Sequence, residues 1–183
     1  MSDINFKELS YLREGNKVQQ RIAEVLEQGL VMDKLRKFDP VLIGTFPIDI
    51  AVEGSDLDIA CYYQNKEEFI QTVQLSFLFI EDYTLTEVEI GGIPTVVVNF
   101  TLEEFPVELF AQPRPVEEQN GYRHMLIEYA ILNEKGDSFK QEVIKLKKAG
   151  IKTEPAFAQL LGLTGNPYDS LLLYGNKELD RYE

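Results

Sequence analysis

The sequence is poor in the features of secreted and membrane proteins. Its 183 residues include one cysteine, Cys61, so no disulfide can form within the chain. No apolar run approaches the roughly 20 residues that a membrane-spanning helix needs. The first residues, Met1–Asn5, lack the basic start and apolar stretch of a signal peptide. These absences favour a reducing, cytoplasmic setting away from membranes.

Basic residues are also scarce. There are 18 Lys and Arg against 31 Asp and Glu, which gives a formal net charge of −13. Binding to long nucleic acid depends on Lys and Arg that neutralise phosphates, so a polynucleotide partner is disfavoured. A small nucleotide that arrives with a divalent cation remains compatible, because the metal supplies positive charge locally. The acidity can equally serve solubility alone.

Several common catalytic motifs are absent from the sequence. It contains no Cys/His cluster with zinc spacing, no Walker loop and no nucleophile elbow around a serine. The single histidine, His124, follows an arginine within a helical pattern. Its role stays open between a structural residue and a general base.

The overall pattern is that of a mixed α/β domain. The composition, 44% hydrophobic and 27% charged, is ordinary for a globular protein of this length. Alternating and apolar runs predict strands at 41–43, 57–63, 83–90, 93–100 and 105–111. Helical patterns come before the first strand, between the second and third, and after Gln112. We therefore expect an α/β (α+β) mixed sheet in a core of residues 1–112, with a helical extension of residues 113–183 packed on it.

The most informative segment is a glycine turn followed by two aspartates. Gly44-Thr45 ends the first predicted strand, and Asp56 and Asp58 open the second. Residues at i and i+2 of a strand share one face, so both carboxylates point the same way. Such a pair suits Mg²⁺ or Mn²⁺, with a phosphate chain completing the coordination. Taken alone, the pair can also be ordinary acids at an exposed strand end.

A third carboxylate has matching strand parity. Glu108 lies between Val107 and Leu109, which we expect to face the core, just as apolar residues flank Asp58. A two-metal phosphoryl-transfer site needs a further acid from a neighbouring strand. We therefore predict that Asp56, Asp58 and Glu108 converge in space, although other acids precede Glu108 closely.

These residues resemble the signature of the nucleotidyltransferase superfamily, which has the DNA polymerase β-like fold. In that signature a Gly-Gly or Gly-Ser turn precedes an Asp-x-Asp pair. The segments 44–48, 53–58 and 152–158 also look like a bacterial family of uncharacterised function within the superfamily. The resemblance implies a nucleotidyltransferase-like enzyme that transfers a nucleoside monophosphate from an NTP to a hydroxyl acceptor. It implies these site residues: Asp56, Asp58 and Glu108 as catalytic and Mg²⁺-binding or Mn²⁺-binding carboxylates, and Gly44, Thr45 and Ser55 as nucleotide contacts.

The chain departs from the superfamily pattern at two places. Thr45 stands where Ser or Gly is usual, and Phe46–Ile50 replaces a basic, glycine-bearing turn. The positive charge for the triphosphate tail must then come from the helical extension, with Arg123 first and Lys152 second. We expect this extension to fold over the face that carries the aspartates. The lysines near the end of the helix before Gly150, including Lys147, are predicted to face solvent.

Other functions remain open from the sequence. The first alternative is a catalytically silent nucleotidyltransferase-fold protein that binds or regulates, and the second is a mixed-sheet interaction domain without a site. The acceptor can be a small molecule, a tRNA end or a protein side chain. The sequence leaves the nucleotide and the oligomeric state undetermined.

Overall fold

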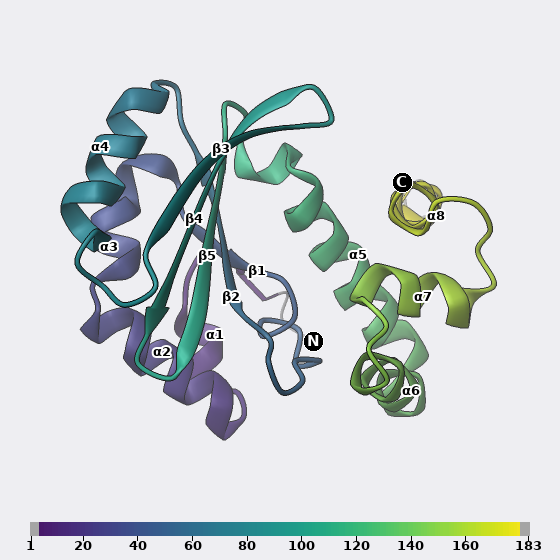
Figure 1. Cartoon of the computed structure of the whole chain (residues 1–183). Helices are drawn as coiled ribbons and strands as arrows, with labels where there is room; N and C mark the ends of the chain where they lie inside the picture. The colour runs from purple at the N-terminus through teal and green to yellow at the C-terminus, as the bar shows by residue number, and fades with distance from the viewer. Residues whose placement is uncertain (1–3, 180–183) are drawn as a thin grey trace.

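The computed structural model describes residues 4–179, with the side chains of 177–179 left aside, as a mixed sheet between two helical layers (Figure 1). The strands are β1 (Val41–Ile43), β2 (Leu57–Tyr62), β3 (Thr84–Ile90), β4 (Ile93–Leu102) and β5 (Phe105–Gln112). The helices are α1 (Ser10–Arg13), α2 (Lys17–Gln28), α3 (Val31–Leu35), α4 (Lys66–Phe77), α5 (Asn120–Lys135), α6 (Asp137–Lys148), α7 (Thr153–Leu161) and α8 (Pro167–Leu179), with short 3-10 turns η1 (Arg36–Phe38) and η2 (Val116–Glu118). The predicted α/β fold with a mixed sheet is confirmed.

The sheet has the strand order β1-β2-β5-β4-β3. β2 and β5 pair in parallel, and the other neighbours are antiparallel. The parallel pair requires a long crossover, and the chain makes it through α4 and the β3–β4 hairpin, which turns at Gly91-Gly92. The crossover brings β5 beside β2, so residues 50 positions apart in the sequence become direct neighbours, as in the pair Asp58 and Glu108.

The first helical layer, α1–α4, covers one face of the sheet. Asn16 caps α2 and forms a capping box with Gln19. The buried side of α2, including Leu26, packs with Leu57 and Ile59 of β2 in one hydrophobic core. Because Leu57 and Ile59 point into this core, Asp58 between them must point to the other face of the sheet.

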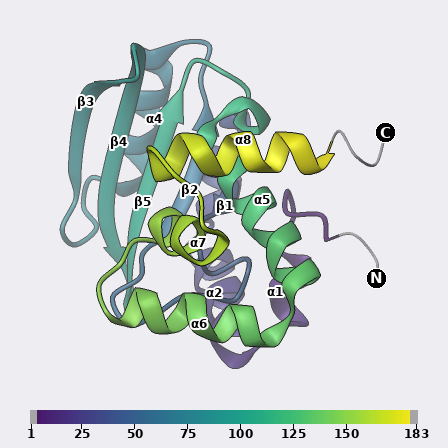
Figure 2. The same ribbon diagram turned by 90° about the vertical axis from the view of Figure 1, so that its right-hand side faces the viewer.

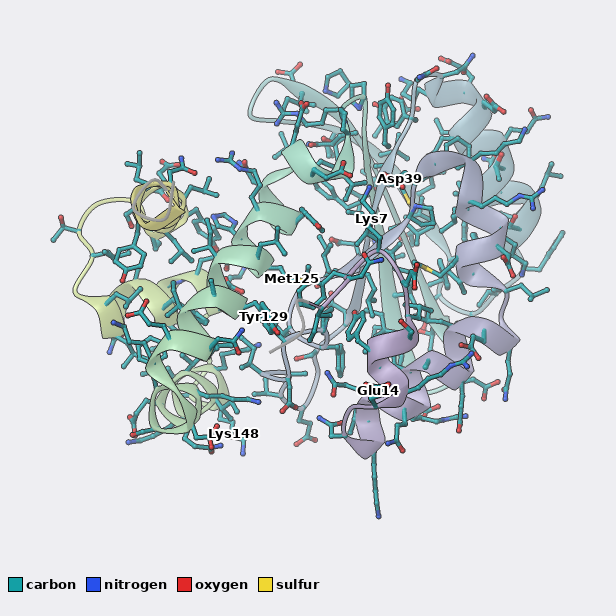
Figure 3. The ribbon with its side chains drawn as sticks, turned by 180° about the vertical axis from the view of Figure 1, so that it is seen from behind. Lys7, Glu14, Asp39, Met125, Tyr129 and Lys148 are labelled. Carbon is teal, nitrogen blue, oxygen red and sulfur yellow. The ribbon has the colours of Figure 1, made fainter. Side chains whose placement is uncertain are left out.

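The second helical layer, α5–α8, covers that other face (Figure 2). Met125 and Tyr129 lie on the side of α5 that faces the sheet (Figure 3), and Met125 belongs to a second core with Val41 and Ile43 of β1. The sheet therefore carries a hydrophobic core on each face, and the cavity described below lies between the second face and α5–α8. Within the described residues, no helix has both the length and the apolar character needed to cross a membrane.

Candidate active site

Three carboxylates from the strands line one cavity of about 750 Å³. Asp58 of β2 is in register with Glu108 of β5 and also with Ile43 of β1. Asp56 lies just before β2 and lines the same cavity. The structure thus brings together the three acids that strand parity predicts, and we call this side of the cavity the strand wall.

Gly44 holds the turn beneath Asp58. Its φ is +78°, and a Cβ built at this position would lie 2.4 Å from Oδ2 of Asp58. Both the backbone conformation and the close approach require glycine here. Thr45 and Ser55 also line the cavity, and the Ser55 hydroxyl accepts a hydrogen bond from the Val52 amide at 3.0 Å. Gly44, Thr45 and Ser55, three of the four residues predicted to contact the nucleotide, therefore border the same space.

The segment that replaces the basic turn, Phe46–Ile50, is built into the two cores. Phe46 is 7% exposed and packs edge-to-face on Phe105, with ring centroids 6.0 Å apart. The acid of this segment, Asp49, forms an ion pair with Lys140 of α6 instead of lining the cavity. The segment thus supports the fold and adds neither positive nor negative charge to the cavity lining.

The carboxylates of the strand wall repel one another. Burial raises the pKa of Asp58 to about 8, and the charges of Asp56 and Glu108 add to the rise. Burial also raises the pKa of Glu108, with Asp56 as the second cause. A cation placed among these carboxylates would offset the burial and the mutual repulsion that raise their pKa values, because it favours the ionised forms.

The opposite side of the cavity, here called the helical wall, comes from α5–α8. It includes His124 and Glu128 of α5, Lys147 of α6, Glu154 of α7 and Tyr168 of α8. His124 is 6% exposed, and its Nε2 lies 3.0 Å from the Tyr168 carbonyl oxygen. Since a carbonyl only accepts, Nε2 carries the hydrogen of this bond. The Nδ1 atom then faces Glu154, with 3.7 Å to Oε1.

The prediction that Lys147 faces solvent is wrong. Lys147 lines the cavity, and burial lowers the pKa of its ammonium to about 8 against the opposing effect of four acids, led by Glu128 and Glu154. Lys148, the next residue, is exposed at the outer edge of the molecule (Figure 3). The sequence signal that could have found Lys147 is Val143, which is four residues earlier, fully buried, and therefore on the same helix face.

Arg123, in contrast, lies outside the cavity lining. Its guanidinium points along α5 and toward α8, with hydrogen bonds of 3.5 Å to the Asn120 and Asn176 side chains. Lys152, the second predicted source of positive charge, does line the cavity. Sequence reasoning therefore named one of the two lysines of the cavity and missed Glu128 and Glu154.

A family model described as a domain of unknown function, DUF4269, matches residues 24–174. The chain belongs to this family. The match includes both walls of the cavity, so the site described above is part of the DUF4269 domain. None of the curated proteins matches the sequence.

Solved structures resemble the DUF4269 chain in fold. A Cid1 poly(U) polymerase with MgGTP bound has a TM-score of 0.52 at 12% identity, over 76% of this chain and 46% of that one. The GLD-2/RNP-8 complex has a TM-score of 0.51 at 12% identity, over 81% of this chain and 59% of that one. The DUF4269 chain thus spans about half the length of these neighbours and has the nucleotidyltransferase fold.

The strand wall of the DUF4269 chain fits a divalent cation by its chemistry. Carboxylate oxygens are the ligands that Mg²⁺ and Mn²⁺ prefer. Among the described residues, however, no group of three or more His, Cys, Asp or Glu is arranged to hold a metal ion by itself. Mg²⁺ in phosphate-transfer sites is usually held by one or two carboxylates together with substrate phosphates. The donor set of the strand wall is therefore compatible with a divalent cation that has further ligands from outside the chain.

Proposed function

We propose that this DUF4269 protein is a nucleotidyltransferase that moves a nucleoside monophosphate from an NTP to a hydroxyl acceptor. The observation that carries the proposal is the register of Asp58 with Glu108 on parallel strands, beside Asp56 and against the Gly44 turn. The fold supports it, since the similar Cid1 structure is a poly(U) polymerase described with MgGTP bound.

Each wall of the cavity has a part in the reaction. Gly44, Thr45 and Ser55 hold the phosphates from the strand side, and Lys147 and Lys152 hold the triphosphate tail from the helical side. Lys147 thereby takes the role that the sequence assigned to Arg123. Since both lysines come from α6 and the loop after it, the nucleotide bridges the two walls.

The acceptor oxygen attacks the α-phosphorus, the bond from this phosphorus to the bridging oxygen breaks, and pyrophosphate leaves. Glu108 accepts the proton of the attacking hydroxyl. It lies on β5, which is separated by β2 from the glycine turn after β1. The glycine turn holds the phosphates in this proposal, so Glu108 is the carboxylate left on the side where the acceptor enters. Asp56 and Asp58, with Glu108, would hold Mg²⁺ or Mn²⁺, which when bound neutralises charge on the phosphates and the attacking oxygen. The chain itself contributes mainly positioning and electrostatic complementarity.

A labelling experiment tests this function. The purified protein is incubated with each α-labelled NTP and a small-molecule or macromolecular fraction of a cell extract, with and without Mg²⁺. We expect transfer of label that requires Mg²⁺ and falls about 100-fold or more in an Asp56→Asn/Asp58→Asn variant. Asp33→Asn, at an exposed position of α3, is the matched control and should keep full transfer.

Equal labelling by the double variant would contradict the proposal. So would the absence of any calorimetric signal when the wild type is titrated with millimolar NTP and Mg²⁺. Nucleotide binding without transfer would instead favour the second candidate, a catalytically silent binding or regulatory protein. The observation that favours this candidate is the core packing of Phe46–Ile50, where some small nucleotidyltransferases carry a basic turn.

A further inference from the structure

Asp49 connects three parts of the fold through its carboxylate. Its Oδ2 forms an ion pair of 2.5 Å with the Lys140 ammonium of α6, and its Oδ1 accepts a hydrogen bond of 2.5 Å from the side chain of Asn16, the residue that caps α2. The φ of Asp49 is +56°, a left-handed conformation that side chains other than Asp and Asn seldom adopt. Such a conformation persists where the surrounding contacts determine it. Asp49 is therefore held in place from two sides.

The turn that carries Asp49 begins at the cavity. Thr45 lines the cavity, and its carbonyl oxygen accepts a hydrogen bond of 3.0 Å from the Ile50 amide. Within this turn, the Phe46 carbonyl oxygen accepts a hydrogen bond of 3.2 Å from the Asp49 amide. Asp49 itself lies outside the cavity lining. The turn thus fixes Asp49 relative to Thr45 without bringing its charge into the cavity.

Lys140 lies on the same face of α6 as the lysine of the cavity. Lys140, Val143 and Lys147 occupy positions i, i+3 and i+7, which share one face of a helix and span roughly 10 Å along its axis. Val143 is fully buried, Lys147 lines the cavity, and Lys140 lies outside the lining. Among the described residues, the Asp49–Lys140 pair is the only ion pair or hydrogen bond between α6 and residues 1–112. This pair and the packing of Val143 therefore set where Lys147 lies relative to the glycine turn.

We propose that Asp49 is a positioning residue, which acts through Lys140 and α6 to hold Lys147 at the triphosphate tail of the nucleotide. The inference rests on the proposed function for the identity of the bound group. The segment 46–50 contains no Lys or Arg of its own. It contributes positive charge indirectly, because its acid anchors the helix whose lysine lines the opposite wall.

Two variants break the pair from opposite sides. Asp49→Asn removes the charge and keeps a side chain that tolerates positive φ, and Lys140→Met removes the ammonium and keeps an apolar stem. The side chains of Asp49 and Lys140 are 50% and 23% exposed, and ion pairs that are partly in water stabilise a fold only slightly. Both variants should therefore remain folded, which thermal unfolding verifies. Glu142→Gln is the matched control, because it breaks the exposed pair of Glu142 with Lys145 on the same helix.

Calorimetric titration with Mg²⁺ and a non-hydrolysable NTP analogue gives the first readout. We expect Asp49→Asn and Lys140→Met each to weaken binding about fivefold or more, and Glu142→Gln to bind like the wild type. In a Lys147→Ala background, Asp49→Asn should cause no further loss, because its effect passes through the ammonium that is already missing. A purely structural role of Asp49 would produce the same loss in both backgrounds. That result, or unchanged binding by Asp49→Asn alone, would overturn the inference.

A second readout needs no nucleotide. Cys61 is fully buried, so spin labels can be attached at two introduced cysteines, Lys148→Cys on α6 and Asp33→Cys on α3, both exposed positions. Pulsed electron paramagnetic resonance then measures the distance between α6 and the first part of the chain. We expect a broader or shifted distance distribution in Asp49→Asn and an unchanged one in Glu142→Gln.

The two readouts separate this inference from the proposed function. An unchanged distance distribution in both Asp49→Asn and Lys140→Met would overturn the inference, whatever the nucleotide does. If the NTP analogue fails to bind to the wild type while both variants displace α6, the proposed function falls. The control of α6 by Asp49 would then be supported, and the triphosphate tail as the group that Lys147 meets would be overturned.

Discussion

At the scale of single residues, Asp58 combines two opposing demands. The register with Glu108 and the contact with Gly44 hold its carboxylate in a partly buried place, where a charge is disfavoured. Chemistry with phosphates needs that same carboxylate ionised. In the proposed reaction a cation that arrives with the nucleotide would satisfy both demands, so we expect the ionisation of Asp58 to depend on nucleotide binding.

This conflict predicts how stability depends on pH. The pKa of Asp58 is about 8 in the folded protein, against about 3.9 for an unfolded aspartate. The folded state therefore binds more protons between these values, so the free energy of unfolding decreases as pH rises through this window. In metal-free urea titrations, Asp58→Asn should gain stability over the wild type, by on the order of 2 kcal/mol more at pH 8 than at pH 5.

Asp33→Asn is the control, because Asp33 is exposed on α3 and does not line the cavity. Its difference from the wild type should be the same at both pH values. If the stability difference between Asp58→Asn and the wild type were also the same at both pH values, the Asp58 carboxyl would ionise as easily in the folded protein as in the unfolded one. That result would contradict the prediction.

Gly44 gives a second prediction at this scale. Gly44→Ala places a methyl group against Oδ2 of Asp58 and puts an alanine at positive φ. We expect a loss of about 1–3 kcal/mol in stability and a loss of nucleotide binding. Gly150→Ala has a φ of +89° and open space around the added methyl group, so it should cost about 1 kcal/mol and leave binding unchanged. Chemical denaturation and calorimetry measure both effects.

At the scale of elements, the orientation of α6 decides which lysine lines the cavity in which we propose that the nucleotide binds. Lys147 shares a face with buried Val143 and lines the cavity, whereas Lys148 is turned outward. Lys147→Ala should therefore weaken calorimetric binding of NTP with Mg²⁺ about tenfold or more, since an ammonium–phosphate contact is lost. Lys148→Ala and Arg123→Ala should bind like the wild type. Equal losses for Lys147→Ala and Lys148→Ala would indicate only long-range charge attraction.

The position of Lys147 on α6 is an example of what the sequence could not predict. Strand parity has a period of two, so Asp58 and Glu108 could be assigned to one face from their apolar neighbours alone. The glycine turn and the positions of the strands along the chain followed from equally local signals, whereas the strand order within the sheet was not predicted. Lys147 and Glu128, however, depend on how α5 and α6 rotate against the sheet and α7. Charges at a helix end are compatible with solvent or with a cavity, and only packing distinguishes the two.

At the scale of the whole molecule, we propose that residues 1–112 and 113–183 form the two parts predicted from the sequence, joined by the packing of α5–α8 on the sheet of the first part. The second core combines Val41 and Ile43 of β1 with side chains of α5–α8. A fragment of residues 1–112 would expose this apolar face to water. We expect it to lack a cooperative thermal transition, whereas the full chain unfolds in one. A sharp transition of the fragment near that of the full chain would mean that the first part folds independently.

The origin of the two walls in separate parts of the chain also sets the order in which the site is assembled. During synthesis Asp58 emerges about 90 residues before Lys147, which at roughly 5–20 residues per second is a delay of several seconds or more. In that interval we expect the strand carboxylates to be hydrated, because α6 and α7, which help to enclose the cavity, have not yet been synthesised. We expect docking of α5–α8 to exclude water from the strand wall and to bring Lys147 and Lys152 to the cavity. We therefore expect a nascent or truncated chain that lacks α5–α8 to have the carboxylates of the proposed reaction without the lysines and the enclosed cavity.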